Sequence, residues 1–221
     1  MAYRRTAEVE ERLADKRQRI VKAVRRVVGE VGFREAQIGM VAAAAGVATG
    51  TVYRYFPSKA ELFAEAVSLN SAHEVEVVAA VVEADGAPVA RLETALRVFA
   101  SRALRARRLA YAMIAEPAEA EVEAARLKYR RAFGRLFQRL IEEGIAAKEI
   151  PPQDAEAISA CIVGALIEGL IGPLAPDAAH EAEAPPLVDT IVAFCLRAVG
   201  ARVAHTRGAI ARLRPLSGGK P

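Results

Sequence analysis

Tryptophan is absent from the chain, and cysteine and histidine are rare. Cys161 and Cys195 lie far apart within apolar helical patterns, with no CxxC pair and no histidine nearby, so we expect two buried thiols in a reducing compartment. His73, His180 and His205 are scattered without metal-ligand spacing, and the chain contains no nucleophile elbow, phosphate-binding glycine loop or HExxH motif. These absences predict a protein that is not an enzyme and holds no metal and no cofactor.

Aromatic residues make up only 5% of the 221 residues, whereas hydrophobic residues make up 53% and are largely alanine. Such a composition favours helices over strands. Residues 1–12 contain no apolar run, so we expect no signal peptide. Residues 158–175 approach the length of a membrane span, but Glu168 and several glycines interrupt them. We therefore expect a cytoplasmic all-α protein that has no membrane partner.

Positive charge is concentrated at one end of the chain. The formal net charge is +4, but residues 1–60 hold twelve Lys and Arg against six Asp and Glu, a net charge of +6. The remaining residues carry a net charge of −2. A basic excess confined to one region is typical of a site for a polyanion such as DNA.

The stretch over residues 37–62 predicts a helix-turn-helix, a unit that presents its second helix to the major groove of DNA. Gly46 follows a short apolar helix and lacks a Cβ, which suits a left-handed turn residue. The second helix is expected over Thr49 to Tyr55. The inward-facing residues are Ile38, Val41, Ala42, Ala45, Val47, Val52 and Phe56.

The other face of the second helix carries hydrogen-bonding groups for phosphates and base edges, with a glycine where backbone must approach closely. An ordinary polar surface helix is the alternative that these residue types leave open. The residues on this face are Thr49, Gly50, Thr51, Tyr53, Arg54 and Tyr55.

A capping box follows, in which Ser58 caps the amide of Glu61 and Glu61 reaches back to Ser58. It predicts a new helix from Lys59, whose first turn has free N–H groups and a partial positive charge. With the charge of Lys59 added, this helix start is suited to bind a DNA phosphate.

The run AGVATGTVYRYFPSK, from Ala45 to Lys59, resembles the DNA-binding signature of TetR/AcrR-type transcriptional regulators. The motif resemblance covers residues 12–65, and beyond it the helical layout and length agree. It implies DNA contacts from five residues, of which Tyr53 and Lys59 usually bind phosphates. Ala48 and Gly39 depart from the usual small hydroxyl and polar residues, so Thr49 or the backbone near Ala48 must cap the second helix. The five residues are Thr49, Thr51, Tyr53, Tyr55 and Lys59.

The remaining sequence predicts further helices, about nine in all, and a chain of this length accommodates a small head and a larger body. We expect a DNA-binding head over residues 1–57, with a polar arm at 1–11, and an effector-binding and dimerisation body over 58–203. Residues 204–221 are expected to form a disordered tail. The helix that starts after Ser58 should connect head and body.

Two apolar stripes lie on the helix near residues 158–174, and the last helix, over 187–203, shows the same excess. One core covers one stripe, so we expect these helices to pair with their copies in a two-fold homodimer. Burial of both stripes inside one protomer is the alternative. The expected interface residues are Val163, Ile167, Ile171, Leu174, Ile191, Phe194 and Cys195.

Large apolar side chains amid alanines predict a ligand cavity in the body, with a plain core as the alternative. The resemblance implies that this cavity binds a small effector. The candidate residues are Phe99, Tyr111, Met113, Arg130, Phe133 and Phe137, with Glu168 as a further polar candidate. The sequence thus predicts a repressor that binds a palindromic double-stranded operator as a homodimer and is released by a small apolar or aromatic effector. A helical sensor or scaffold without specific DNA binding is the alternative.

Overall fold

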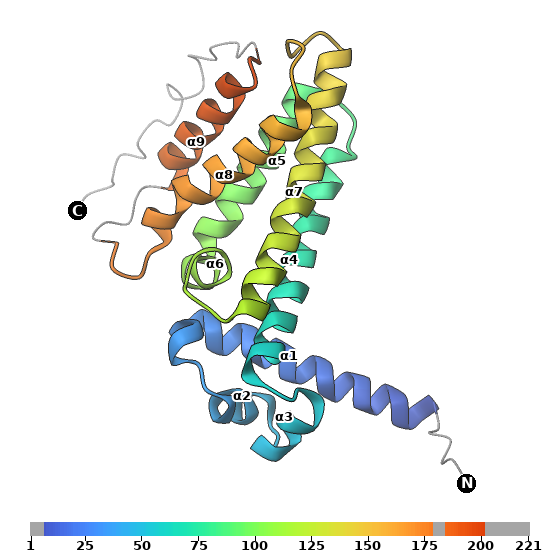
Figure 1. The fold of residues 1–221 in the computed structure, drawn as a ribbon, viewed down its shortest axis with the longest axis vertical. Helices are drawn as coiled ribbons and strands as arrows, with labels where there is room; N and C mark the ends of the chain where they lie inside the picture. The colour runs from blue at the N-terminus through green and yellow to red at the C-terminus, as the bar shows by residue number, and fades with distance from the viewer. Residues whose placement is uncertain (1–6, 179–183, 202–221) are drawn as a thin grey trace, which may run out of the picture.

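The computed structural model describes residues 7–178 and 184–201, and within these ranges the chain forms nine α-helices and no strand (Figure 1). The predicted all-α fold is therefore confirmed. The tail predicted at residues 204–221 lies outside the described residues. The helices are α1 (Ala7–Glu35), α2 (Ile38–Ala45), α3 (Thr49–Tyr55), α4 (Lys59–Val82), α5 (Pro88–Arg105), α6 (Arg107–Ile114), α7 (Ala120–Ala146), α8 (Ala155–Leu174) and α9 (Ala184–Ala198).

The head is built from α1, α2, α3 and the start of α4, and it lies at the lower end of the molecule in Figure 1. Ile20, Val24 and Val28 recur at four-residue spacing along one face of α1 and are fully buried. They share one hydrophobic cluster with Val41 of α2 and Val52 of α3. Because burying one such side chain stabilises a fold by about 1.5–3 kcal/mol, this interior fixes how the short helices α2 and α3 sit on α1.

The first helix begins earlier than predicted and contains a kink. The polar arm expected at residues 1–11 is helical from Ala7 onward. Gly32 kinks the helix with φ 82° and ψ 177°, and the helix resumes up to Glu35. Glycine adopts a positive φ at little cost, whereas other residues are strained there.

Helix α4 belongs to both regions of the molecule. Leu62 and Phe63 in its first turns are part of the head cluster, whereas Val78 and Val82 in its last turns are part of a separate body cluster. This confirms the prediction that one helix connects the head with the body. The core of the head therefore extends past the boundary predicted at residue 57.

In the body, α5 and α7 pack against the second half of α4, α8 packs against α5 and α7, and α9 packs against α5 and α8 (Figure 1). Pro88 occupies the first turn of α5, where its missing N–H has no partner to lose. The fully buried large side chains of the body come from α5, α7 and α8 and form one continuous core. They include Leu92, Leu96, Phe137, Leu140, Ile141, Leu166 and Leu170.

Among the described residues, α8 is the one helix long and apolar enough to cross a membrane by length and composition. It packs against α5, α6, α7 and α9, so the body core accounts for part of its apolar surface. Cys195 of α9 is fully buried, as predicted, and this burial raises its pKa to about 11. The same prediction is wrong for Cys161, which is exposed because its neighbours Ile162 and Val163 take the buried positions of α8.

Candidate DNA interface and effector cavity

The turn between α2 and α3 is held by backbone hydrogen bonds. Gly46 has φ 67° and ψ 41°, the left-handed conformation that the sequence predicts, and its N–H donates to the Ala43 carbonyl at 3.1 Å. The Val47 N–H donates to the Ala42 carbonyl at 3.0 Å, which closes the end of α2. Val52, fully buried, then anchors α3 on the head. The opposite face of α3 points outward.

The outward face of α3 presents the polar residues proposed to contact DNA. Thr49, Gly50 and Arg54 are exposed, and the Tyr53 side chain is 51% exposed. Thr51 and Tyr55 are half-buried. The helix has no side-chain cap; instead, the Thr51 N–H donates to the Ala48 carbonyl at 2.8 Å. The backbone near Ala48 therefore starts the helix, which leaves the Thr49 hydroxyl free of a capping role.

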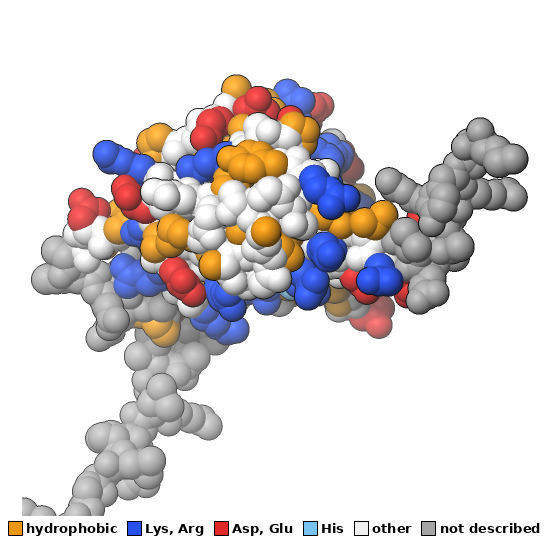
Figure 2. Space-filling model, turned by 90° about the horizontal axis from the view of Figure 1, so that it is seen from below, with side chains coloured by type: hydrophobic (Ala, Val, Ile, Leu, Met, Phe, Trp, Pro, Cys, Tyr) orange, Lys and Arg blue, Asp and Glu red, His pale blue; other side chains and the backbone are white. Residues whose placement is uncertain are grey.

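Figure 2 views the molecule from the α2–α3 end. Lys and Arg side chains lie on several sides of a central area made of backbone, uncharged and hydrophobic groups, and Asp and Glu lie toward its margins. Gly39 of α2 and Gly50 of α3 are both exposed, and a Cβ built at either position meets no atom within 4 Å. Backbone is thus directly accessible at two points of the helix-turn-helix, which suits close approach to a duplex.

The start of α4 shows half of the predicted capping box, since Ser58 Oγ accepts from the Glu61 N–H at 3.1 Å. The Lys59 ammonium does not project freely. It donates to the Phe33 carbonyl at 3.3 Å and lies 5.0 Å from the centre of the Phe63 ring. In this arrangement Lys59 fastens α4 to the end of α1, so a phosphate contact requires its Nζ to leave Phe33.

A second link between head and body is made by Glu116, in the turn between α6 and α7. Its carboxylate accepts the N–H of Phe33 at 3.0 Å and the N–H of Arg34 at 3.1 Å. These amides follow the kink at Gly32, where an added Cβ would lie 2.7 Å from both carboxylate oxygens. The kink and the absence of a side chain therefore allow Glu116 to bind the end of α1. We call this contact the Glu116 clamp.

Arg126 of α7 supports the clamp from the other side. Its guanidinium is 5% exposed and donates to the carbonyls of Met113 at 3.1 Å and Glu116 at 2.7 Å, and also to the Ala112 carbonyl. It also pairs with Glu123. Burial lowers the pKa of the Arg126 guanidinium, but an arginine stays charged at neutral pH. Arg126 thus fixes the turn that carries Glu116.

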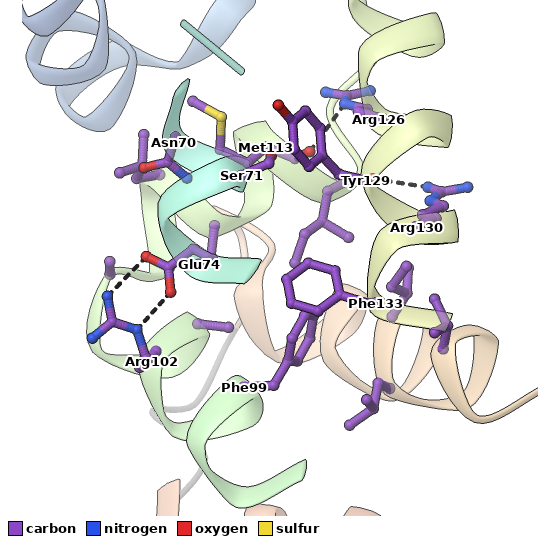
Figure 3. Close-up of a pocket in the computed structure, with 18 of the residues that line it drawn as sticks. Asn70, Ser71, Glu74, Phe99, Arg102, Met113, Arg126, Tyr129, Arg130 and Phe133 are labelled. Carbon is purple, nitrogen blue, oxygen red and sulfur yellow. Dashed lines mark hydrogen bonds and ion pairs between the residues drawn. The ribbon is translucent and has the colours of Figure 1, made fainter. Parts of the chain in front are cut away.

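Arg126 also lines a cavity with a volume of about 120 Å³, which lies between α4, α5, α6, α7 and α8 and is bordered by Arg25 of α1 (Figure 3). Five residues predicted as a ligand site line this cavity: Phe99, Met113, Arg130, Phe133 and Phe137. Phe99 and Phe133 meet edge to face with ring centres 4.9 Å apart. The structure thus brings most of the predicted site together.

Tyr111, the sixth predicted residue, is not on the cavity lining. Helix α6 lines the cavity with Ala106, Leu109, Ala110, Met113 and Ile114, a spacing of three and four residues that places position 111 on another face. Tyr111 packs against the body core instead. Glu168, the further polar candidate, is exposed on α8 and also lies outside the lining.

The α4 wall of the cavity, which carries Asn70, Ser71 and Glu74, was not predicted from the sequence. Glu74 accepts two hydrogen bonds from Arg102 of α5, at 2.5 and 2.9 Å, which joins the two helices (Figure 3). The four-residue spacing of Asn70 and Glu74 within an apolar helix was the available signal, because it places both polar groups on one face.

The predicted dimer surface needs correction. Val163, Leu174, Ile191 and Cys195 are buried within the protomer by the packing of α7, α8 and α9, so they are not available to a second copy. Ile167 and Ile171 are half-buried, and Ile167 lines the cavity. Only Phe194, 52% exposed, faces outward. The alternative considered for the apolar stripes, burial within one protomer, therefore accounts for most of these residues.

The outward face of α8 is instead made of small residues at helical spacing. A Cβ built on Gly164 or Gly172 meets no atom within 4 Å, so this face is flat and open. The exposed residues of α8 are these small residues and two glutamates: Glu156, Ala157, Ala160, Cys161, Gly164, Glu168 and Gly172. Together with Phe194 of α9, they form the surface that we call the α8–α9 face.

These features define a class of protein: a DNA-binding regulator with a helix-turn-helix head on a helical effector domain. Family comparison agrees. A model of bacterial regulatory proteins of the tetR family matches residues 20–66, and a model of the tetracyclin repressor-like C-terminal domain matches residues 85–168. The chain belongs to the TetR/AcrR family of transcriptional regulators, as the sequence resemblance indicates.

Solved structures share this fold. The transcriptional regulator FadR from Bacillus subtilis, in complex with stearoyl-CoA, aligns with a TM-score of 0.71 and 18% identity over 82% of this chain and 98% of its own. A TetR/AcrR regulator from Thermobifida fusca aligns at 0.66 and 24% over 82% and 97%. RolR in complex with resorcinol aligns at 0.67 and 20% over 93% and 98%. No curated protein sequence matches the chain.

Proposed function

We propose that the protein is a repressor that binds a palindromic operator as a homodimer and is released by a small effector. The outward polar face of α3, anchored from behind by Val52, is the observation that carries this proposal. Thr49, Tyr53 and Arg54 extend from this face with hydroxyl, phenol and guanidinium groups, which bind phosphates and base edges.

The second copy is expected on the α8–α9 face, which is the flat surface beside an exposed Phe194. Small residues let two helices approach closely, and an isologous pairing repeats the contact across a two-fold axis. The dimer then presents two α3 helices to successive major grooves about 34–36 Å apart. A single head would bind fewer phosphates and read only one half-site.

A dimer variant tests this surface. Gly164→Arg places a long charged side chain in open space on α8, so the protomer should fold while the pairing is lost. Ala124→Arg, at an exposed position of α7, is the matched control. Sedimentation should give a monomer for Gly164→Arg and a dimer for the control. A dimer that tolerates arginine at position 164 would place the interface elsewhere.

Release by an effector is expected to use the links between head and body. The Glu116 clamp and Lys59 hold the end of α1 against the α6–α7 turn and α4. Helix α4 lines the cavity, as does α6, the helix that leads into that turn. A ligand that favours a different position of α4 and α6 would therefore move the heads and change their spacing. It changes operator occupancy only through its different affinity for the two arrangements. Structural relatives that carry stearoyl-CoA and resorcinol support a small-molecule effector.

The runner-up, a helical sensor that does not read DNA, is favoured by the engagement of Lys59 with Phe33. Salt dependence separates the two functions. A regulator that makes about 6–10 phosphate contacts loses roughly 10³- to 10⁵-fold in affinity between 50 and 200 mM salt. If the affinity for a duplex is weak and does not change with salt concentration, the sensor function is favoured.

A pair of variants then separates base reading from phosphate binding. Arg54→Ala should weaken binding to all duplexes similarly, whereas Thr49→Ala should change the preference among sequences by about 1–3 kcal/mol if its hydroxyl reads a base. Equal losses on every sequence from both variants would remove Thr49 from the reading set.

A further inference from the structure

The cavity is polar at one end and apolar at the other. Figure 3 shows Asn70, Ser71 and Tyr129, together with Met113, in the upper part of the cavity, Phe99 and Phe133 in the lower part, and the Glu74–Arg102 pair to one side. The apolar end continues into the body core through Phe137, Val163, Leu166 and Ile167. A ligand that fits both ends must itself be amphipathic, with a polar group on an apolar body.

The polar end carries excess positive charge. Four arginines line the cavity against one acid, Glu74. Arg102 is paired with Glu74, and Arg126 is occupied by three carbonyls and Glu123. The other two guanidinium groups, those of Arg25 and Arg130, have no acidic partner among the described residues.

These two arginines come from different regions. Arg25 lies on α1 and has no hydrogen bond or ion pair among the described residues, and Arg130 lies on α7 and donates one bond, to the Ile114 carbonyl at 3.2 Å. Both are exposed, which places them at the open side of the cavity. A guanidinium presents paired donors that match a carboxylate. An anionic group is therefore the ligand feature that this end recognises.

Asn70 supplies a second requirement. Its side-chain oxygen is buried and has no hydrogen-bond partner among the described residues, although Ser71 and Tyr129 line the same cavity. Leaving a buried polar atom without a hydrogen-bond partner costs about 1–3 kcal/mol. A hydrogen bond between the ligand and the Asn70 amide would therefore stabilise the complex. Because the Asn70 amide has both a donor nitrogen and an acceptor oxygen, it can hydrogen-bond a polar ligand atom in either orientation of the amide.

The size of the cavity limits the apolar part of the ligand. At about 120 Å³ it is somewhat smaller than an apolar cavity of about 150 Å³ that holds benzene. The edge-to-face pair of Phe99 and Phe133 gives this end aromatic walls. One ring, or a chain of a few carbons, fills such a space.

We propose that the effector is a compact aromatic or short-chain carboxylic acid, with its carboxylate between Arg25 and Arg130 and its apolar part against Phe99 and Phe133. This assignment rests on the proposed function, since it names the ligand of the same cavity. Because Arg25 belongs to the head and Arg130 to the body, the carboxylate bridges the two regions beside the Glu116 clamp. The charge of the ligand is then part of the switch.

Calorimetric titration of the full chain without DNA tests the ligand class. The probes are phenylacetate, 2-phenylethanol and phenethylamine, which share one ring and differ in charge, with hexanoate, hexanol and hexylamine as the short-chain set. Each acid should bind at least about 10-fold more tightly than its alcohol, because hydrogen bonds to charged groups are stronger than neutral ones, and the amines should bind most weakly. Equal binding within each set, or tighter binding of the amines, would overturn the proposal.

Variants assign the charge effect to the two arginines. Arg25→Gln and Arg130→Gln should each remove most of the preference for the acid and leave binding of the alcohol unchanged. Arg131→Gln, at the exposed position next to Arg130 and outside the cavity lining, is the control and should retain the preference. Loss of preference in the control, or its retention in both test variants, would contradict the assignment.

A separate measurement distinguishes this proposal from the proposed function. If phenylacetate binds through the arginines but leaves affinity for a duplex unchanged, the ligand class stands and regulation by this cavity fails. If the duplex binds and responds only to neutral compounds, regulation stands and the carboxylic-acid assignment fails.

Discussion

The head and the body differ in how far neighbouring residues determine their structure. In the head, Gly46 ends α2 in the left-handed conformation and Val52 anchors α3, so the outward face follows from a few consecutive positions. In the body, the long helices carry apolar residues on more than one side, and distant partners decide which side is buried. Near neighbours in the sequence therefore determine the structure of the head, whereas tertiary packing determines which faces of the body helices are buried.

The largest effects are expected when one aromatic ring is removed from each core. Phe63 in the head and Phe137 in the body are both fully buried, and Phe→Ala at such sites costs about 3–5 kcal/mol. Phe63→Ala should abolish duplex binding, whereas Phe137→Ala should keep it and alter ligand binding, because Phe137 lines the cavity. Thermal unfolding and duplex titration give both results. Loss of duplex binding in Phe137→Ala alone would reverse the roles of the two cores.

Substitution at the kink of α1 should have the next largest effect. Gly32→Ala forces a side chain to φ 82° and places its Cβ 2.7 Å from the Glu116 carboxylate. Strain of this kind costs about 1–3 kcal/mol. We expect a lower melting temperature and a weakened Glu116 clamp, which reduces the effect of a ligand on duplex affinity. Unchanged stability would show that the clamp does not depend on the kink.

A smaller effect is expected at Gly50, where stability and affinity for a duplex should respond differently to substitution. Gly50→Ala adds a methyl group where no atom lies within 4 Å, so stability should hold or rise. If the backbone of α3 lies against a duplex, the same methyl should lower affinity by about 10-fold, since close backbone approach is lost. Thermal unfolding and duplex titration are compared on one preparation. Unaltered affinity would move the DNA contact away from Gly50.

The smallest expected change concerns Gly39 of α2, where an added Cβ also meets open space. Replacing glycine within a helix by alanine stabilises it by about 0.5–1 kcal/mol. Gly39→Ala should therefore raise the melting temperature slightly, in contrast to Gly32→Ala. A fall in stability would mean that the glycine serves a conformation other than the helical one observed.

Local signals account for what the sequence could predict. The bounds of α3, the conformation of Gly46 and the cap at Ser58 depend on near neighbours, and all three predictions are confirmed. The Glu116 clamp escaped prediction because Glu116 and Phe33 are far apart in sequence and neither belongs to a motif. In this respect the joint between the regions resembles the body rather than the head.

The body shows the same limit in its side chains. Periodicity placed Val163 and Cys161 on α8 but did not indicate which stripe would face α7 and which would face solvent, so their burial was misassigned. Similarly, Tyr111 and Met113 lie two residues apart on α6, and only the packing of that helix decides that Met113 borders the cavity. In each case, the neighbouring helices in the folded structure determine which side chain is buried or borders the cavity.

The central proposal is that a homodimer binds one palindromic duplex through its two heads. Selection of bound fragments from random double-stranded DNA tests it most directly, because sequence, symmetry and spacing are read together. We expect an inverted repeat whose half-sites are about one helical turn, or a multiple of it, apart. Recovery of fragments without a shared sequence, or of a single half-site bound by one chain, would contradict the account.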